Sequence, residues 1–140
     1  MTTDLAAMDA FLAEPRNAMV AAVRKDGRPQ MTPNWFLWQD GKFYISTTKT
    51  RAKFRLFSRD PRVQLAIDDS TGFRYVIVNG VVAIEDDTDS GLPFFRALRH
   101  KHGRDEQSED DLRAEMIRDE RVLLVVTPDN PQADWLSRGF

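Results

Sequence analysis

The sequence predicts a small, mainly β domain of the α+β class, in which six antiparallel strands close into a barrel and helices lie at its periphery. Short runs rich in β-branched and aromatic residues are separated by hairpin signals such as Lys25-Asp26-Gly27 and Asp40-Gly41. Strands and crossover helices do not alternate regularly, so a parallel, Rossmann-type sheet is not expected. With 140 residues, 41% of them apolar, the chain is expected to be one domain over residues 1–140.

The first half of the chain predicts a helix and then a meander of three strands. Apolar residues at helical spacing begin after Thr3 or Asp4, either of which can cap the helix, and Pro15 lies beyond its end. The predicted strands are 18–24, 29–38 and 42–48.

The second half alternates strands with longer connections. A short helix is predicted to end before Asp60-Pro61, and Gly80 within a long strand indicates a bulge or a close backbone approach. The predicted elements are a helix at 50–59, strands at 62–68 and 73–84, helices at 87–102 and 108–118, and a last strand at 121–127.

Composition limits the classes of function. The net charge of −2 gives no general attraction for nucleic acid, and the absence of cysteine excludes a disulfide framework and thiolate chemistry. No apolar run reaches membrane-spanning length, and residues 1–14 lack the pattern of a signal peptide. A cytoplasmic protein without nucleic-acid or membrane partners is the resulting expectation.

A basic helix start after a hydroxyl-rich strand end is the first candidate site. Ser46, Thr47 and Thr48 are followed closely by Arg51 and Lys53, which are predicted to be partly exposed at the first turn. A helix start offers unpaired N–H groups and a positive dipole end, and hydroxyls and guanidinium groups suit a phosphate. The alternative is a solvated helix with scattered positive charge.

The segment Trp35-Phe36-Leu37-Trp38 is the second candidate. Strand alternation places Trp35 and Leu37 on one face and Phe36 and Trp38 on the other. One interpretation is a core on one side and a subunit contact on the other, which predicts a dimer. The alternative is that these rings form the wall for a planar ring system.

Two further groups of residues predict no chemistry. His100, Lys101 and His102 precede Gly103 at an expected helix end, where the dipole favours cations, so they are interpreted as the basic end of a helix and not as a metal site. The acidic runs lie at turns and helix starts, which they can cap. The motifs of hydrolases and nucleotide-binding loops are missing, and no catalytic residue is assigned.

Several of these segments together resemble the pyridoxamine 5′-phosphate oxidase-like split β-barrel superfamily. More narrowly, they are similar to its branch that uses the deazaflavin coenzyme F420. The segments that carry the resemblance are Asp26-Gly27-Arg28-Pro29, Trp35-Phe36, Arg51-Ala52-Lys53, Arg59-Asp60-Pro61-Arg62 and the stretch 119–128.

The resemblance implies a homodimer with a cofactor in a groove between the subunits. Carried over by position, Arg51 and Lys53 bind the phosphate of the coenzyme, and Phe73 of the other subunit is an aromatic neighbour of it. The other implied cofactor-binding residues are Ser46, Thr47 and Thr48 at the strand end, and Gln30, Thr32, Pro33 and Asn34 beside the deazaflavin ring.

The resemblance also implies an activity, a hydride transfer from reduced F420 to a conjugated small-molecule acceptor. Authentic pyridoxamine phosphate oxidases carry basic residues on the strand that here runs from Pro29 to Trp35 without Arg or Lys. This difference disfavours vitamin B6 oxidation and flavin mononucleotide (FMN). The alternatives are an FMN-binding oxidase or flavin reductase of the same fold, and a non-catalytic F420-binding or carrier protein.

Overall fold

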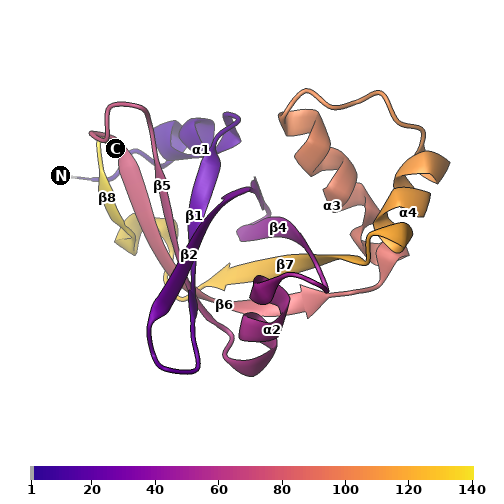
Figure 1. The fold of residues 1–140 in the computed structure, drawn as a ribbon. Helices are drawn as coiled ribbons and strands as arrows, with labels where there is room; N and C mark the ends of the chain where they lie inside the picture. Colours follow the sequence, from indigo (N-terminus) through magenta and orange to yellow (C-terminus); the bar gives the residue numbers. More distant parts are fainter. Residues whose placement is uncertain (1) are drawn as a thin grey trace.

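The structure is a computed structural model that describes residues 2–140 (Figure 1). Its strands form one antiparallel sheet in the order β2-β1-β5-β6-β7-β4-β3, and β8 pairs with β6. The helices are α1 Leu5–Ala13, α2 Ala52–Arg59, α3 Thr88–Lys101 and α4 Glu109–Arg118, with a 3₁₀ turn at Gln132–Asp134. The strands are β1 Asn17–Val23, β2 Pro29–Trp35, β3 Leu37–Gln39, β4 Lys42–Thr48, β5 Arg62–Asp68, β6 Tyr75–Glu85, β7 Arg121–Pro128 and β8 Leu136–Arg138.

The sheet curls, and its two ends are joined through a single residue. β2 pairs with β1 at one end of the sheet, β3 pairs with β4 at the other, and only Phe36 separates β2 from β3. Within residues 2–140 no ladder pairs β2 with β3 or β4, so the sheet is an open, curled half-barrel, which is consistent with the expected split β-barrel but not with a fully closed one. The predicted count of six strands is too low, because the predicted strand 29–38 divides at Phe36 and β8 is added.

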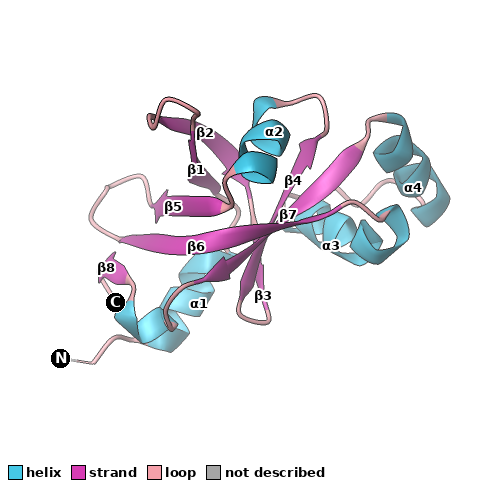
Figure 2. Cartoon of the chain, turned by 90° about the horizontal axis from the view of Figure 1, so that it is seen from below, coloured by secondary structure: helices cyan, strands magenta, loops and turns pink. Residues whose placement is uncertain are grey.

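The main core fills the inside of this curl. Val20 lies opposite Leu65, and Leu65 lies opposite Val78, so strand register places apolar side chains in rows on the inner face. The ring of Phe36 is fully buried in the same core. Figure 2 shows α1 and α2 beside the curled sheet, while α3 and α4 lie together at one end of it.

Gly80 is required by a close backbone contact, as the sequence predicted. It lies opposite Pro128 in the β6–β7 pair. A Cβ atom at this position would lie 2.5 Å from the carbonyl oxygen of Thr127, which is closer than atoms approach without displacement. Glycine therefore allows β7 to lie tightly against β6, and β7 carries one wall of the site described below.

Helices α3 and α4 form a separate layer at the ends of β4 and β7 (Figure 1). Their starts are capped as the sequence suggests: Asp87 accepts from the Ser90 N–H at 2.9 Å, and Ser108 accepts from the Asp111 N–H at 3.1 Å. A second, smaller core holds them against the sheet, consisting of Tyr44, Leu92, Phe95, Leu112, Met116 and Leu123. Among residues 2–140, no helix has the length and apolar character needed to cross a membrane.

Candidate functional site

A cavity of about 510 Å³ lies between the curled sheet and the α3–α4 layer. Its walls come from β1, β2, β4, β7 and the start of α2 on one side and from α3, α4 and the loop after α3 on the other. The lining residues are Asn17, Pro33, Asn34, Trp35, Ser46, Arg51, Phe95, Leu98, Arg99, Arg104, Met116 and Arg121.

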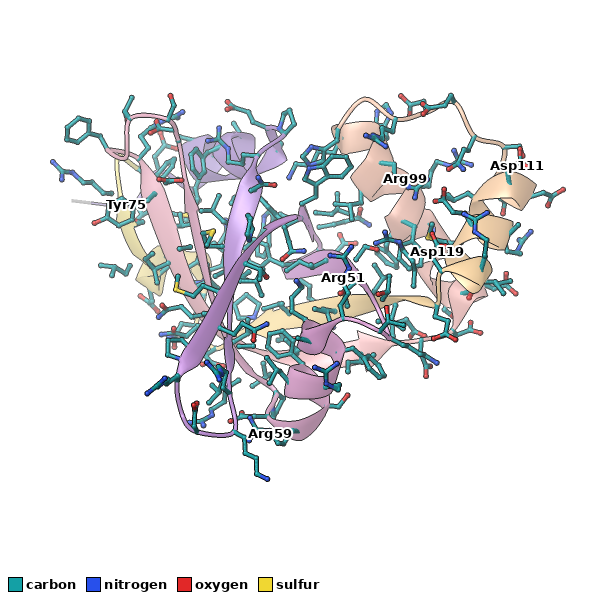
Figure 3. All side chains as sticks on the ribbon, in the orientation of Figure 1. Arg51, Arg59, Tyr75, Arg99, Asp111 and Asp119 are labelled. Carbon is teal, nitrogen blue, oxygen red and sulfur yellow. The ribbon has the colours of Figure 1, made fainter. Side chains whose placement is uncertain are left out.

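The charge of this lining is entirely positive. Four of the lining residues are arginines and none is an Asp or Glu, although the chain as a whole has a net charge of −2. Figure 3 shows Arg51 on the sheet side of the space and Arg99 on the helix side, with Arg59 at the far end of α2. A cavity that concentrates one sign of charge favours a ligand of the opposite sign, so this cavity is suited to an anion.

The start of α2 adds unpaired donors to the same site. Arg51 is the N-cap residue of α2, and its side chain makes no capping hydrogen bond. Thr48 and Thr50, which could have capped the helix, instead lie with their hydroxyl oxygens 2.9 Å apart. The first N–H groups of α2 therefore have no side-chain acceptor, and a helix start of this kind attracts an anion.

Lys53 differs from its prediction, because it is buried and not partly exposed. Its Nζ donates to Thr32 Oγ1 at 2.9 Å, and Thr32 Oγ1 donates in turn to Asn34 Oδ1 at 3.1 Å. Burial lowers the pKa of Lys53, and the Arg51 guanidinium lowers it further. Asn34 lines the cavity but Lys53 does not, so Lys53 acts on the cavity by holding Thr32 and Asn34 in place.

The three hydroxyls predicted at the end of β4 divide among different surroundings. Ser46 lines the main cavity. Thr48 lines an adjoining cavity of about 500 Å³ together with Arg51 and Arg121. Thr47 is buried, and its Oγ1 has no hydrogen-bond partner among the described residues.

The predicted alternation along 35–38 is confirmed. Phe36 is buried in the main core and Trp38 packs against it, while Leu37 packs against the smaller core beside α3 and α4. Trp35 lines the cavity, and its ring is stacked on that of His102 at a centroid distance of 3.9 Å and an angle of 4°. Trp35 thus brings an aromatic ring to the cavity lining, with one face of the ring covered by His102, and the interpretation as a wall for a planar ring system stays a prediction.

The predicted helix end at residues 100–102 is confirmed, because α3 ends at Lys101 and His102 is its C-cap residue, but two of these side chains also make contacts with other parts of the chain. Lys101 Nζ donates to the carbonyls of Leu12 and Phe36, at 2.8 Å each, and lies 3.7 Å from the centre of the Phe36 ring. His102 is stacked on Trp35, and burial lowers its pKa, with smaller effects from Lys101 and Arg104. His100 is exposed, and its Nδ1 lies 2.7 Å from Asp105 Oδ1.

Six of the ten predicted residues lie outside the lining of the main cavity: besides Thr32, Thr47, Thr48 and Lys53, these are Gln30 and Phe73. Gln30 is half-buried on the edge strand β2 and does not line the cavity. Phe73 is 65% exposed, two residues before Tyr75, which Figure 3 shows at one end of the molecule, away from Arg51 near the middle. The guanidinium of Arg138 lies 5.3 Å from the Phe73 ring. A role for Phe73 beside this cavity would need a second subunit.

Three lining arginines were not among the predicted site residues. Arg99 and Arg104 come from α3 and the loop after it, and Arg121 is the first residue of β7. Arg104 also lies with its guanidinium 5.4 Å from the Trp35 ring centre. The pairing of Thr48 with Arg121 brings Arg121 to the site, and sequence patterns do not specify which strands pair.

Known structures share this fold. A protein described as an F420 reductase is 27% identical, with a TM-score of 0.71, over 87% of this chain and 93% of that chain. A conserved hypothetical protein from Mycobacterium tuberculosis has a TM-score of 0.83 at 20% identity, over 99% of this chain and 86% of that chain. HutZ, described as the heme storage protein from Vibrio cholerae, has a TM-score of 0.70 at 14% identity, over 100% of this chain and 97% of that chain.

The family itself is shown by a match that spans most of the domain. The model of the family described as pyridoxamine 5′-phosphate oxidase matches residues 5–132, which include all the lining residues of the cavity. The chain therefore belongs to the pyridoxamine 5′-phosphate oxidase family.

Proposed function

We propose that this protein is an oxidoreductase that uses the deazaflavin coenzyme F420 to reduce a conjugated small molecule. The observation that carries the proposal is the arginine-lined cavity without acids, which opens beside the uncapped start of α2. The similarity to an F420 reductase supports the choice of coenzyme. The reaction class follows from the coenzyme, because cofactors of this type carry the hydride chemistry while the protein binds and orients them.

The residues of the cavity fit a flat, phosphorylated coenzyme. Arg51 and the free N–H groups of α2 would hold its phosphate, with the Ser46 hydroxyl beside them. Pro33, Asn34 and Trp35 would border its ring system from the edge strand β2. These are polar groups at one end and flat or aromatic groups at the other, as the ligand requires.

Reduced F420, when bound, supplies a hydride from its deazaflavin ring. The chain contributes orientation and the exclusion of water. Lys53 holds Thr32, and through it Asn34, at a fixed position on the cavity wall. Phe95, Leu98 and Met116 place apolar surface on the α3–α4 side, which keeps water from that wall.

An FMN-dependent oxidase or reductase is the second candidate. The sequence disfavours FMN as the cofactor, because the strand from Pro29 to Trp35 has no basic residue. In the structure Lys53 reaches that strand from α2 and bonds Thr32, so the strand does have a cation beside it. A non-catalytic carrier of F420 is the third candidate, and tight binding without turnover over a broad panel of acceptors would favour it.

A cofactor titration tests the proposal directly. We expect the protein to be colourless when purified from a host that lacks F420, and to bind added F420 more tightly than FMN. Fluorescence titration of both compounds against the same protein measures the two affinities. Stoichiometric FMN in the purified protein, or tighter binding of FMN, would replace the F420 proposal with the FMN candidate.

We also propose that the protein is a homodimer. The outer face of β1, β5 and β6 has two shallow pockets, of about 200 and 270 Å³. Apolar side chains form most of the lining of both pockets. Beside this face Met31 on β2 and Leu136 on β8 are 54% and 66% exposed. Pairing of two such faces would cover them, and an isologous dimer is the simplest arrangement.

The dimer is tested by light scattering at micromolar concentration, with a dimer mass expected. Leu136→Glu places a charge beside this face and should shift the mass towards the monomer. Ile117→Glu is the matched control, because Ile117 on α4 is 59% exposed and lies away from this face. A monomeric wild-type protein would remove the dimer and, with it, the role of Phe73 from a partner subunit.

A further inference from the structure

Arg121 has the surroundings of a ligand-binding residue, and no role follows for it from the sequence. It is the first residue of β7 and lies opposite Thr48, the last residue of β4. Its Nη1 donates to Ser46 Oγ at 3.2 Å, while its buried Nε has no partner among the described residues. The side chain lines both the main cavity and the adjoining one.

The acids near Arg121 are engaged by other arginines. Glu115 pairs with Arg99, and Asp119 pairs with Arg118 at 3.2 Å. Within residues 2–140, Arg121 has no carboxylate within ion-pair distance. Glu115 and Asp119 therefore act on Arg121 only from a greater distance.

Two other arginines, Arg99 and Arg51, lie close enough to affect Arg121. Burial lowers the pKa of Arg121, and the positive charges of Arg99 and Arg51 lower it further, against the opposing effect of Asp119 and Glu115. Arg51 also has no ion pair among the described residues. Two guanidinium groups without counterions thus line the same pair of cavities.

Such an arrangement is unfavourable until an anion is present. Arg121 is half-buried, and the partial withdrawal of a cation from water costs free energy unless the charge is paired, while the positive charge of the exposed Arg51 adds repulsion. A structural arginine at this position would be stabilised by the carboxylates beside it, but these bond elsewhere. The unfilled donors of Arg121 therefore indicate a partner from outside the chain.

We propose that Arg121 and Arg51 form a clamp for the phosphate group of the ligand, with Ser46 as a hydroxyl contact between β4 and β7. This deepens the proposed function, on which it rests for the identity of the phosphorylated compound. Phosphate fits better than carboxylate, because two guanidinium groups and a helix start offer more N–H donors than a carboxylate can accept. Arg121 takes the contact role that was predicted for Lys53, which is buried behind Thr32.

The first test compares FMN with riboflavin, two ligands that differ only in the phosphate. Both are titrated against the wild-type protein and against Arg121→Gln, and F420 is titrated beside its deazaflavin core, which lacks the phosphate together with the chain attached to it. We expect Arg121→Gln to weaken binding of the phosphorylated compound about tenfold, as for one charge-assisted hydrogen bond, and to leave the dephosphorylated one unchanged. Arg113→Gln is the matched control, since Arg113 on α4 is paired with Asp89, Glu109 and Asp110 outside the cavity.

The second test needs no coenzyme. Inorganic pyrophosphate should raise the melting temperature of the wild-type protein and of Arg113→Gln, and should not raise that of Arg121→Gln. Without any ligand, Arg121→Gln should melt at the wild-type temperature or above it, because the substitution removes an unpaired cation. A structural arginine would give the opposite result, a lower melting temperature.

The outcomes separate the clamp from the proposed function. If pyrophosphate stabilises the wild type but neither coenzyme binds, the proposed function fails and the clamp stands. If a coenzyme binds and Arg121→Gln weakens the phosphorylated and dephosphorylated forms equally, the clamp fails and the proposed function stands. A wild-type protein that shows no phosphate-dependent binding in either test overturns the clamp.

Discussion

Lys101→Ala is expected to lower the free energy of unfolding by ~2–4 kcal/mol, because it leaves two buried carbonyls without their donor. Lys101 Nζ bonds the carbonyl of Leu12 at the end of α1 and that of Phe36 between β2 and β3. It therefore ties the end of α3 to two other parts of the chain. Urea denaturation at neutral pH measures the change. Lys42→Ala, at an exposed lysine of β4, is the control and should have little effect.

The pH dependence of stability distinguishes the ammonium group of Lys101 from the packing of its stem. Burial lowers the pKa of Lys101 to about 8 from 10.5, with a smaller effect from Arg16. Between these two values the unfolded chain binds more protons, so the free energy of unfolding should rise with pH from about 8 to 10.5. Lys101→Met keeps the stem over Phe36 and should remove this rise. A rise of equal size in Lys101→Met would contradict the assignment.

The order and type of the elements follow from the sequence. Alternating apolar residues and hairpin signals identify the strands, and Asp4, Asp87 and Ser108 mark helix starts that the structure confirms. The division of the strand 29–38 was not predictable, because Phe36 continues the alternation while the chain there passes from one end of the sheet to the other. β8 is three residues long and is fixed only by its pairing with Ile77 and its neighbours.

The cavity was predictable only where its residues are adjacent in the sequence. Pro33, Asn34, Ser46 and Arg51 were predicted as site residues, and all four line it. Arg121 reaches the cavity through the pairing of β4 with β7, which joins segments more than seventy residues apart and has no local signal.

Burial was harder to predict than position. Lysine is rarely buried, so an exposed side chain is the natural expectation from sequence. Lys53 and Lys101 are both withdrawn from solvent because oxygen acceptors, Thr32 Oγ1 for one and two backbone carbonyls for the other, lie where their long stems end. Those acceptors are 21 residues or more away in the chain. Only the folded structure brings them near.

Arg51→Ala is expected to weaken F420 binding by ~1.5–3 kcal/mol, or about ten- to a hundredfold, through loss of a charge-assisted contact to its phosphate. Stability without the coenzyme should be almost unchanged, because Arg51 is exposed and its side chain neither caps α2 nor forms an ion pair among the described residues. Fluorescence titration gives the affinity, and urea denaturation of the ligand-free protein gives the stability.

Two further variants make the result for Arg51 specific. Arg55→Ala removes an exposed arginine from the same helix, at a position that lines neither cavity, and should leave the affinity unchanged. Lys53→Ala should lower both affinity and stability, since Lys53 is buried and holds Thr32 and Asn34. If Arg51→Ala and Arg55→Ala bind F420 equally well, the start of α2 is only a solvated helix end, and the phosphate must be held elsewhere.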